Sequence, residues 1–236
     1  MTELEHPHEF DHEHGDVSGG WLRAATFGAM DGLVSNTALI AGVAAAASAS
    51  AVVLAGVAGL LAGAFSMALG EYTSVTTANE QIDAEARVER YSIKRYPEEE
   101  KAELVDLLMQ KGLSEETARD AVDEIHLDED MAVAVHLSNE IGVDPSAMPS
   151  PLVAAGSSFL TFAVGAIIPL IPYLLGFASL LPGLICGGVG LVIAGAFAAH
   201  FTRKPLWLGG LRQLLYGGVA VGATYLVGHL IGVSVS

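Results

Sequence analysis

The sequence predicts an all-α integral membrane protein with five transmembrane helices and a helical insert between the second and third of them. The chain is 52% hydrophobic, yet its formal net charge is −16 at pH 7. Because soluble domains mix apolar and charged residues throughout, this combination indicates that the two kinds of residue occupy different segments. Of the 27 Asp and Glu residues, six lie before Val17 and 19 lie between positions 80 and 144. Only Asp31 and Glu71 fall inside the apolar stretches.

Five segments are apolar over the roughly 20 residues that a helix needs to cross a hydrocarbon core of about 30 Å. They run over residues 22–47, 51–73, 152–175, 178–201 and 211–233. Residues 48–50 leave room only for a tight turn, so the first two spans form a hairpin, and Gly176 turns the chain between the third and fourth. We therefore expect four parts: a His-rich acidic tail (1–20), spans one and two (21–76), the insert (77–149) and spans three to five (150–236).

The basic residues predict the orientation. Lys and Arg near span ends are retained in the cytosol, and all 11 fall on one side of a five-span arrangement. The N-terminus and the insert are therefore expected to be cytosolic. The N-terminus has no basic region followed by an apolar core and a cleavage site, so the first span is expected to stay in the mature protein. Such a multi-pass protein would lie in the inner (plasma) membrane of a prokaryote or in a vacuolar-type membrane of a eukaryote.

Local signals divide the insert into helices. Residues 77–95 contain no Gly or Pro, so span two is expected to continue into the cytosol as one long helix. Pro97 ends that helix and suits the first turn of the next, which Gly112 stops. Ser114 is a candidate cap for a third helix, and a fourth is expected over about 128–141.

Asp31 is the most informative residue, because a carboxylate inside a spanning helix costs several kcal/mol unless it faces a polar pathway or a partner. It is therefore a candidate ligand for a transported cation. The alternative is that Asp31 lies close enough to the membrane interface to be hydrated and only anchors its helix.

Span two carries a second polar arrangement, in which Gly59, Gly63, Met67 and Glu71 are spaced four apart along one slowly drifting stripe. A thioether sulfur with a carboxylate oxygen suits a borderline transition ion such as Fe²⁺ better than Mg²⁺ or Ca²⁺, which prefer oxygen alone. In the alternative interpretation Met67 only fills space between helices, and Glu71 lies among the lipid headgroups.

The insert offers further candidate ligands, which occur in pairs that share one helix face at a spacing of three or four residues. The pairs are Glu85 with Glu89, Glu100 with Glu103, and His136 with Glu140. Like charges placed in this way destabilise a helix unless a cation or a basic side chain neutralises them. The insert is thus a candidate metal-binding domain, and the alternative is a merely solvated acidic surface.

The sequence contains no metalloprotease, nucleophile-elbow, phosphate-loop or Cys-x-x-Cys motif. We therefore expect no enzyme activity, no prosthetic group and no nucleic-acid partner. The tail could collect metal loosely, or it could be a disordered segment with little function. Its histidines are His6, His8, His12 and His14.

Four motifs resemble the vacuolar iron transporter family. They are FGAMDGLVS at residues 27–35, SMALGEY at 66–72, IPLIPY ending at Tyr173, and EIGVD at 140–144. The resemblance covers nearly the whole chain from Trp21 onward. It implies five spans, a homodimer with the pathway at the subunit interface, a cytosolic metal-binding domain, and export of Fe²⁺ or Mn²⁺ from the cytosol in exchange for protons.

The resemblance also implies roles for particular residues. By position, Asp31 and Met67 match the family's ligands within the membrane, and its cytosolic acidic ligands match Glu89, Glu100, Glu103 and Glu140. Two positions depart from the pattern. Ser92 stands where some members have a second glutamate, for which Glu85 is a candidate substitute, and the region of His136 is where some members have Met and Glu.

The sequence therefore favours a proton-coupled Fe²⁺/Mn²⁺ transporter that moves metal out of the cytosol. Two alternatives stay open. One is a membrane-anchored metal sensor or buffer whose spans only tether the acidic insert, and the other is a metal channel without proton coupling.

Overall fold

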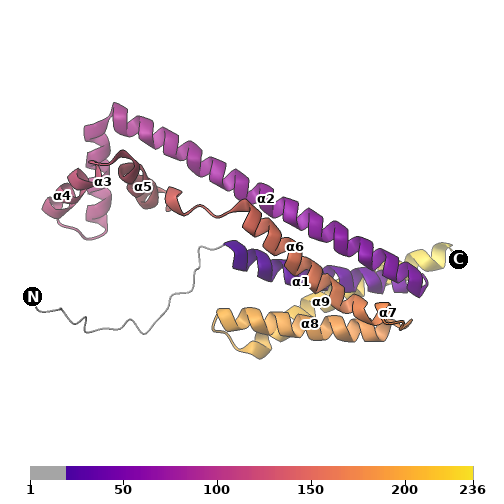
Figure 1. The fold of residues 1–236 in the computed structure, drawn as a ribbon. Helices are drawn as coiled ribbons and strands as arrows, with labels where there is room; N and C mark the ends of the chain where they lie inside the picture. The colour runs from indigo at the N-terminus through magenta and orange to yellow at the C-terminus, as the bar shows by residue number, and fades with distance from the viewer. Residues whose placement is uncertain (1–19, 236) are drawn as a thin grey trace, which may run out of the picture.

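The computed structural model describes residues 20–235, so the predictions for residues 1–19, including the four tail histidines, lie outside the described residues. The described chain is helical and contains no strand (Figure 1). Its α-helices are α1 (Gly20–Ala44), α2 (Ala49–Arg95), α3 (Pro97–Gln110), α4 (Glu115–Ile125), α5 (Glu129–Glu140), α6 (Pro151–Ile167), α7 (Ile171–Leu174), α8 (Leu180–Phe201) and α9 (Leu206–Val235). Short 3-10 turns, η1 (Pro145–Ala147) and η2 (Ile168–Leu170), precede α6 and α7.

Within the described residues, five helical segments are long and apolar enough to cross a membrane. They are α1, α2, the continuous unit from α6 through α7, α8 and α9. This confirms the predicted five-span, multi-pass membrane architecture. The fifth helix begins at Leu206 rather than near residue 211, because the Pro205 carbonyl accepts hydrogen bonds from Leu208 and Gly209 and so starts the helix earlier.

The second span continues without a break into the insert, as the absence of Gly and Pro predicted. Helix α2 has 47 residues, about 70 Å at 1.5 Å per residue, which is more than twice the thickness of the hydrocarbon core. Its acidic half, from Glu80 onward, therefore lies outside the apolar layer that its first half spans. The helix ends at Arg95, and Pro97 occupies the first turn of α3, as predicted.

The membrane bundle is built around α1, which contacts α2, α6, α8 and α9. Its side chains Ala24, Leu33, Ile40 and Ala41 are buried. Glycine permits the closest of these approaches, because a side chain at Gly32 would clash with the backbone of α6. The bundle therefore holds α1 closely against α6.

Two prolines interrupt the helix of the third span. Pro169 lies in η2 and Pro172 opens α7, so one helix becomes three short segments. Gly176 has a φ of +94° and turns the chain toward α8, which is the turn that the sequence predicted.

Helices α3, α4 and α5 form a small bundle at the end of α2 that is remote from the membrane helices (Figure 1). Leu104 and Val105 of α3 pack against Ala118 and Val122 of α4. Ala86 of α2 packs against two buried side chains of α5, Val133 and Leu137. This second contact seats α5 on α2.

The predicted helix boundaries of the insert are confirmed. The Ser114 hydroxyl caps α4 by accepting a hydrogen bond from the Thr117 amide, and the Asp128 carboxylate caps α5 through the Met131 amide. Gly112 and Gly142 follow the ends of α3 and α5 with positive φ.

Candidate metal sites

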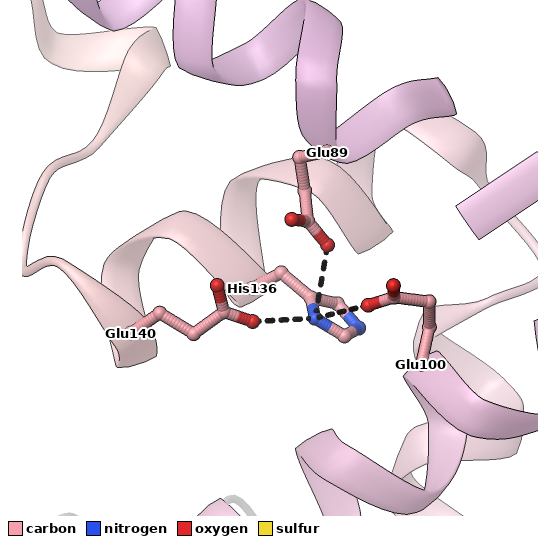
Figure 2. Close-up of side chains that lie close together, drawn as sticks. All are labelled: Glu89, Glu100, His136 and Glu140. Atoms are coloured by element: carbon pink, nitrogen blue, oxygen red, sulfur yellow. Dashed lines mark hydrogen bonds and ion pairs between the residues drawn. The ribbon is translucent and has the colours of Figure 1, made fainter. Parts of the chain in front are cut away.

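Four side chains from three helices converge in the insert (Figure 2). Glu89 comes from α2, Glu100 from the first turn of α3, and His136 and Glu140 from successive turns of α5. The His136 Nδ1 atom lies 3.1 Å from Glu89 Oε1, 3.0 Å from Glu140 Oε1 and 3.9 Å from Glu100 Oε2. We call these four residues the insert cluster.

The spacing of the insert cluster suits a small cation. One ligand atom from each residue can be chosen so that all four lie within 4.8 Å of one another. Ligands held at about 2.1 Å from one ion are at most about 4.2 Å apart. A small inward movement of the carboxylates is therefore enough to close the group around an ion.

Docking of α5 on α2 explains why Glu89 is buried. Ala86 and Glu89 lie one turn apart on the face of α2 that receives α5, and Ile93 continues that face. The Glu89 side chain is 11% exposed and that of His136 is fully buried, whereas Glu140 at the rim is 24% exposed. The cluster thus has a shielded floor and an open rim through which an ion can enter.

The insert cluster holds more negative charge than its own residues neutralise. Burial, followed by repulsion from Glu140, raises the pKa of Glu89 to about 7, although His136 acts in the opposite direction. Burial likewise raises the pKa of Glu100. A bound divalent cation would relieve both effects, since it favours ionised carboxylates.

Glu89 also lacks a hydrogen-bond partner. His136 Nδ1 carries a hydrogen in only one of its two neutral tautomers, and that single hydrogen could serve only one of the facing carboxylates, of which Glu140 is the nearer at 3.0 Å. Glu89 Oε1 is therefore buried without a hydrogen-bond partner despite its 3.1 Å approach to the ring. Burying a polar atom without a hydrogen-bond partner costs free energy, and a bound ligand at Glu89 Oε1 would remove that cost.

A second histidine, which the sequence did not indicate as a site residue, lies against His136. His126 Nε2 is 3.4 Å from His136 Nε2, and His126 Nδ1 is 2.9 Å from the Val122 carbonyl oxygen. The two rings meet edge to face, with their centroids 5.3 Å apart. No helical spacing links these residues, because they belong to different helices, and only the docking of α4 beside α5 brings them together.

Glu85 and Glu103, which were also predicted as ligands, lie outside the insert cluster and are exposed. Glu103 is still close enough for its charge to contribute to the raised pKa values of Glu89 and Glu100. Glu85, the candidate substitute for the glutamate that Ser92 replaces, is thus not among the four converging side chains. Ser92 forms a hydrogen bond with Glu100.

The predicted membrane residues line a separate polar groove between α1 and α2. Asp31 and Met67 both face this groove, whose volume is about 390 Å³, together with Ser35, Asn36 and Ser66. Asn36 is only 2% exposed and donates a hydrogen bond to the Ala166 carbonyl of α6, while its own Oδ1 atom has no hydrogen-bond partner. We call this site the membrane groove.

Glu71 lies outside the membrane groove and forms an ion pair with Arg23 at 3.2 Å. This ion pair was not among the predicted contacts. The sequence could have indicated it, because Arg23 and Glu71 are equally far along the chain from residue 47 in the turn between α1 and α2. Residues equally far from the turn of a helical hairpin lie at similar heights on its two helices. Glu71 therefore has a basic partner in the structure, unlike Asp31, for which no ion pair is found within residues 20–235.

The sequence model of the VIT family matches residues 22–229 of this chain. The chain belongs to the VIT family. It is 34% identical to the vacuolar iron transporter of Acanthamoeba castellanii, over 90% of this chain and 79% of that protein. It is 30% identical to the vacuolar iron transporter of Plasmodium falciparum, over 97% of this chain and 91% of that one. It is also 28% identical to vacuolar iron transporter 2 of Oryza sativa, over 89% and 87% respectively.

VIT family membership confirms the resemblance found in the four sequence motifs. These relatives are named as transporters and not as enzymes, which supports the prediction that the VIT family chain has no enzyme activity. Within this VIT family chain, the structure brings four of the predicted ligands together in the insert cluster and two in the membrane groove. It leaves Glu71, Glu85 and Glu103 outside both sites.

Proposed function

We propose that this VIT family chain exports a divalent metal, Fe²⁺ or Mn²⁺, from the cytosol in exchange for protons. In this scheme the insert cluster collects the ion and the membrane groove passes it across the bilayer. The single observation that carries the proposal is the convergence of three carboxylates on one buried imidazole. Carboxylate and imidazole ligands together suit divalent transition ions. The names of the relatives support iron as a transported ion.

The membrane groove supports transport over a tethered sensor. A simple anchor has no need of a carboxylate and a thioether that line one polar cavity between two spans. Asp31 offers oxygen and Met67 offers sulfur, which favours Fe²⁺ over Mg²⁺ or Ca²⁺. Asp31 is also the carboxylate at which protonation and metal binding would compete, and this competition is the simplest physical basis for exchange.

We further propose that the chain acts as a homodimer whose partner covers the membrane groove. Asp31 is exposed on the surface of a single chain, and the large apolar side chains Phe27 of α1 and Phe65 and Leu69 of α2 are more than half exposed. An ionised carboxylate that faces lipid is costly, so a second copy across this face would exclude lipid from the groove. The distribution of basic residues supports a cytosolic N-terminus and a cytosolic insert.

The test is flux of Mn²⁺ and of Fe²⁺ into sealed vesicles that contain the purified protein, measured with and without a pH gradient. We expect uptake that a pH gradient accelerates and that Asp31→Asn abolishes, because Asn keeps the shape but cannot ionise. Asp144→Asn, which changes an exposed carboxylate outside both sites, is the matched control and should retain uptake. Flux that does not depend on the pH gradient would indicate a channel. Metal binding without any flux would indicate a sensor or buffer.

A further inference from the structure

The contact between His126 and His136 gives the insert cluster a feature that its four ligands alone do not explain. A cation in the cluster needs the lone pair of His136 Nδ1, the ring nitrogen that faces the carboxylates. A neutral imidazole carries one hydrogen, which can sit on either nitrogen. A hydrogen on His136 Nδ1 would bond to Glu140 and block the ion. Some group must therefore hold the hydrogen on Nε2.

The hydrogen bonds of His126 identify that group. The Val122 carbonyl oxygen can only accept, so His126 Nδ1, 2.9 Å away, must donate its hydrogen. A neutral ring with its hydrogen on Nδ1 presents a lone pair on Nε2. That lone pair faces His136 Nε2 at 3.4 Å.

We propose that His126 is a positioning residue that holds the His136 hydrogen on Nε2 and thereby turns the Nδ1 lone pair toward the metal. With its hydrogen on Nδ1 instead, His136 would point the lone pair of its Nε2 at the lone pair of His126 Nε2, 3.4 Å away. Because the His136 ring is fully buried, no water can intervene, and this arrangement is unfavourable. Hydrogen bonds from a ligating histidine to a second group fix its tautomer in this way in many metal sites. This inference rests on the proposed metal binding by the insert cluster.

Three substitutions separate the positioning role from simple packing. His126→Phe keeps a ring at the edge-to-face contact but has no acceptor for the His136 hydrogen. His126→Gln loses the ring but retains an acceptor oxygen at similar reach. Asp123→Asn weakens the 2.6 Å bond between Lys101 and Asp123 that links α3 to α4 and leaves both imidazoles in place, so it controls for looser docking of α4.

Binding of Mn²⁺ to the full-length protein in detergent is measured by the EPR signal of free Mn²⁺. In every protein the histidines at positions 6, 8, 12 and 14 are replaced by Gln, so that the tail cannot bind the probe. We expect His126→Phe to weaken binding by about 10- to 100-fold, and His126→Gln and Asp123→Asn to stay within about threefold of the unsubstituted protein. Nitrogen-15 histidine spectra of the Zn²⁺-loaded protein should place hydrogen on His136 Nε2 and on His126 Nδ1.

The outcomes are distinct. Absence of Mn²⁺ binding by the parent protein would overturn the proposed function itself. Normal binding by His126→Phe, or equal loss in His126→Phe and His126→Gln, would leave the metal site standing and overturn the positioning role. A hydrogen found on His126 Nε2 would overturn it as well.

Discussion

Replacement of Glu89 by Gln should stabilise the metal-free protein at pH 8 and remove its stabilisation by metal. A carboxylic acid whose pKa is raised on folding binds its proton more tightly in the folded state than in the unfolded state. The metal-free protein therefore loses stability as pH rises from about 4.5 to about 7, the ordinary and folded pKa values of Glu89, and loses no more above that. Gln carries no charge at any pH, so the substitution removes this loss.

The size of the effect follows from the two pKa values. The interval from 4.5 to about 7 corresponds to at most roughly 3 kcal/mol at 1.36 kcal/mol for each pH unit. The rim of the cluster is open to water, which screens the charges, so we expect about half of this. For a chain of this size, about 1.5 kcal/mol raises the melting temperature by roughly 3–6 °C.

The assay is thermal unfolding in detergent at pH 5 and pH 8, with and without Mn²⁺. Glu89→Gln should melt above the unsubstituted protein at pH 8 without metal, and close to it at pH 5, where Glu89 is already protonated. With saturating Mn²⁺ the order should reverse, because a ligand at 100 times its Kd stabilises the protein that binds it by about 2.7 kcal/mol. Glu85→Gln, an exposed position one turn away on α2, is the control and should behave like the unsubstituted protein. A metal-free Glu89→Gln protein that melts lower at pH 8 would refute the reasoning.

Three further predictions address the membrane helices. Met67→Leu should lower Fe²⁺ flux more than Mn²⁺ flux, because the thioether favours the softer ion; an unchanged ratio of the two fluxes would assign Met67 to packing. Glu71→Gln should reduce flux by less than about tenfold, because Arg23 already pairs with this carboxylate; a loss as complete as that in Asp31→Asn would place Glu71 on the pathway. In a Cys186→Ala background, cysteines at Gln110 and Ala178 should be labelled from opposite sides of the membrane, and labelling from one side would contradict the five-span orientation.

The helices could be predicted because their limits depend on local residues. Apolar length set the five spans, and single residues such as Pro97, Gly112 and Ser114 set the helix ends of the insert. The His136–Glu140 pair was also predictable, since residues four apart share a helix face. These features need no knowledge of how one helix packs on another.

The membership of the insert cluster could not be predicted from the residues alone. Glu85 and Glu89 look equivalent by spacing, and only the docking of α5 on α2 buries Glu89 and leaves Glu85 outside. The same holds for Glu100 and Glu103 on α3. His126 was missed for a related reason, because its contact with His136 depends on the placement of α4. The resemblance to relatives supplied what helix periodicity could not for Glu89 and Glu100, yet it gave no indication of His126.

The two candidate sites share one rigid element, which constrains how transport could work. Met67 and Glu89 both lie on α2, about 33 Å apart at 1.5 Å per residue. An uninterrupted helix does not shorten, so in the proposed scheme an ion must leave the insert cluster and diffuse to the membrane groove. The many carboxylates of the insert assist this step, because an acidic surface raises the local concentration of cations. That attraction acts on every cation and weakens with salt, so selectivity must come from the groups that touch the ion. Under the proposed function those groups are the His136 imidazole in the insert and the Met67 thioether in the membrane.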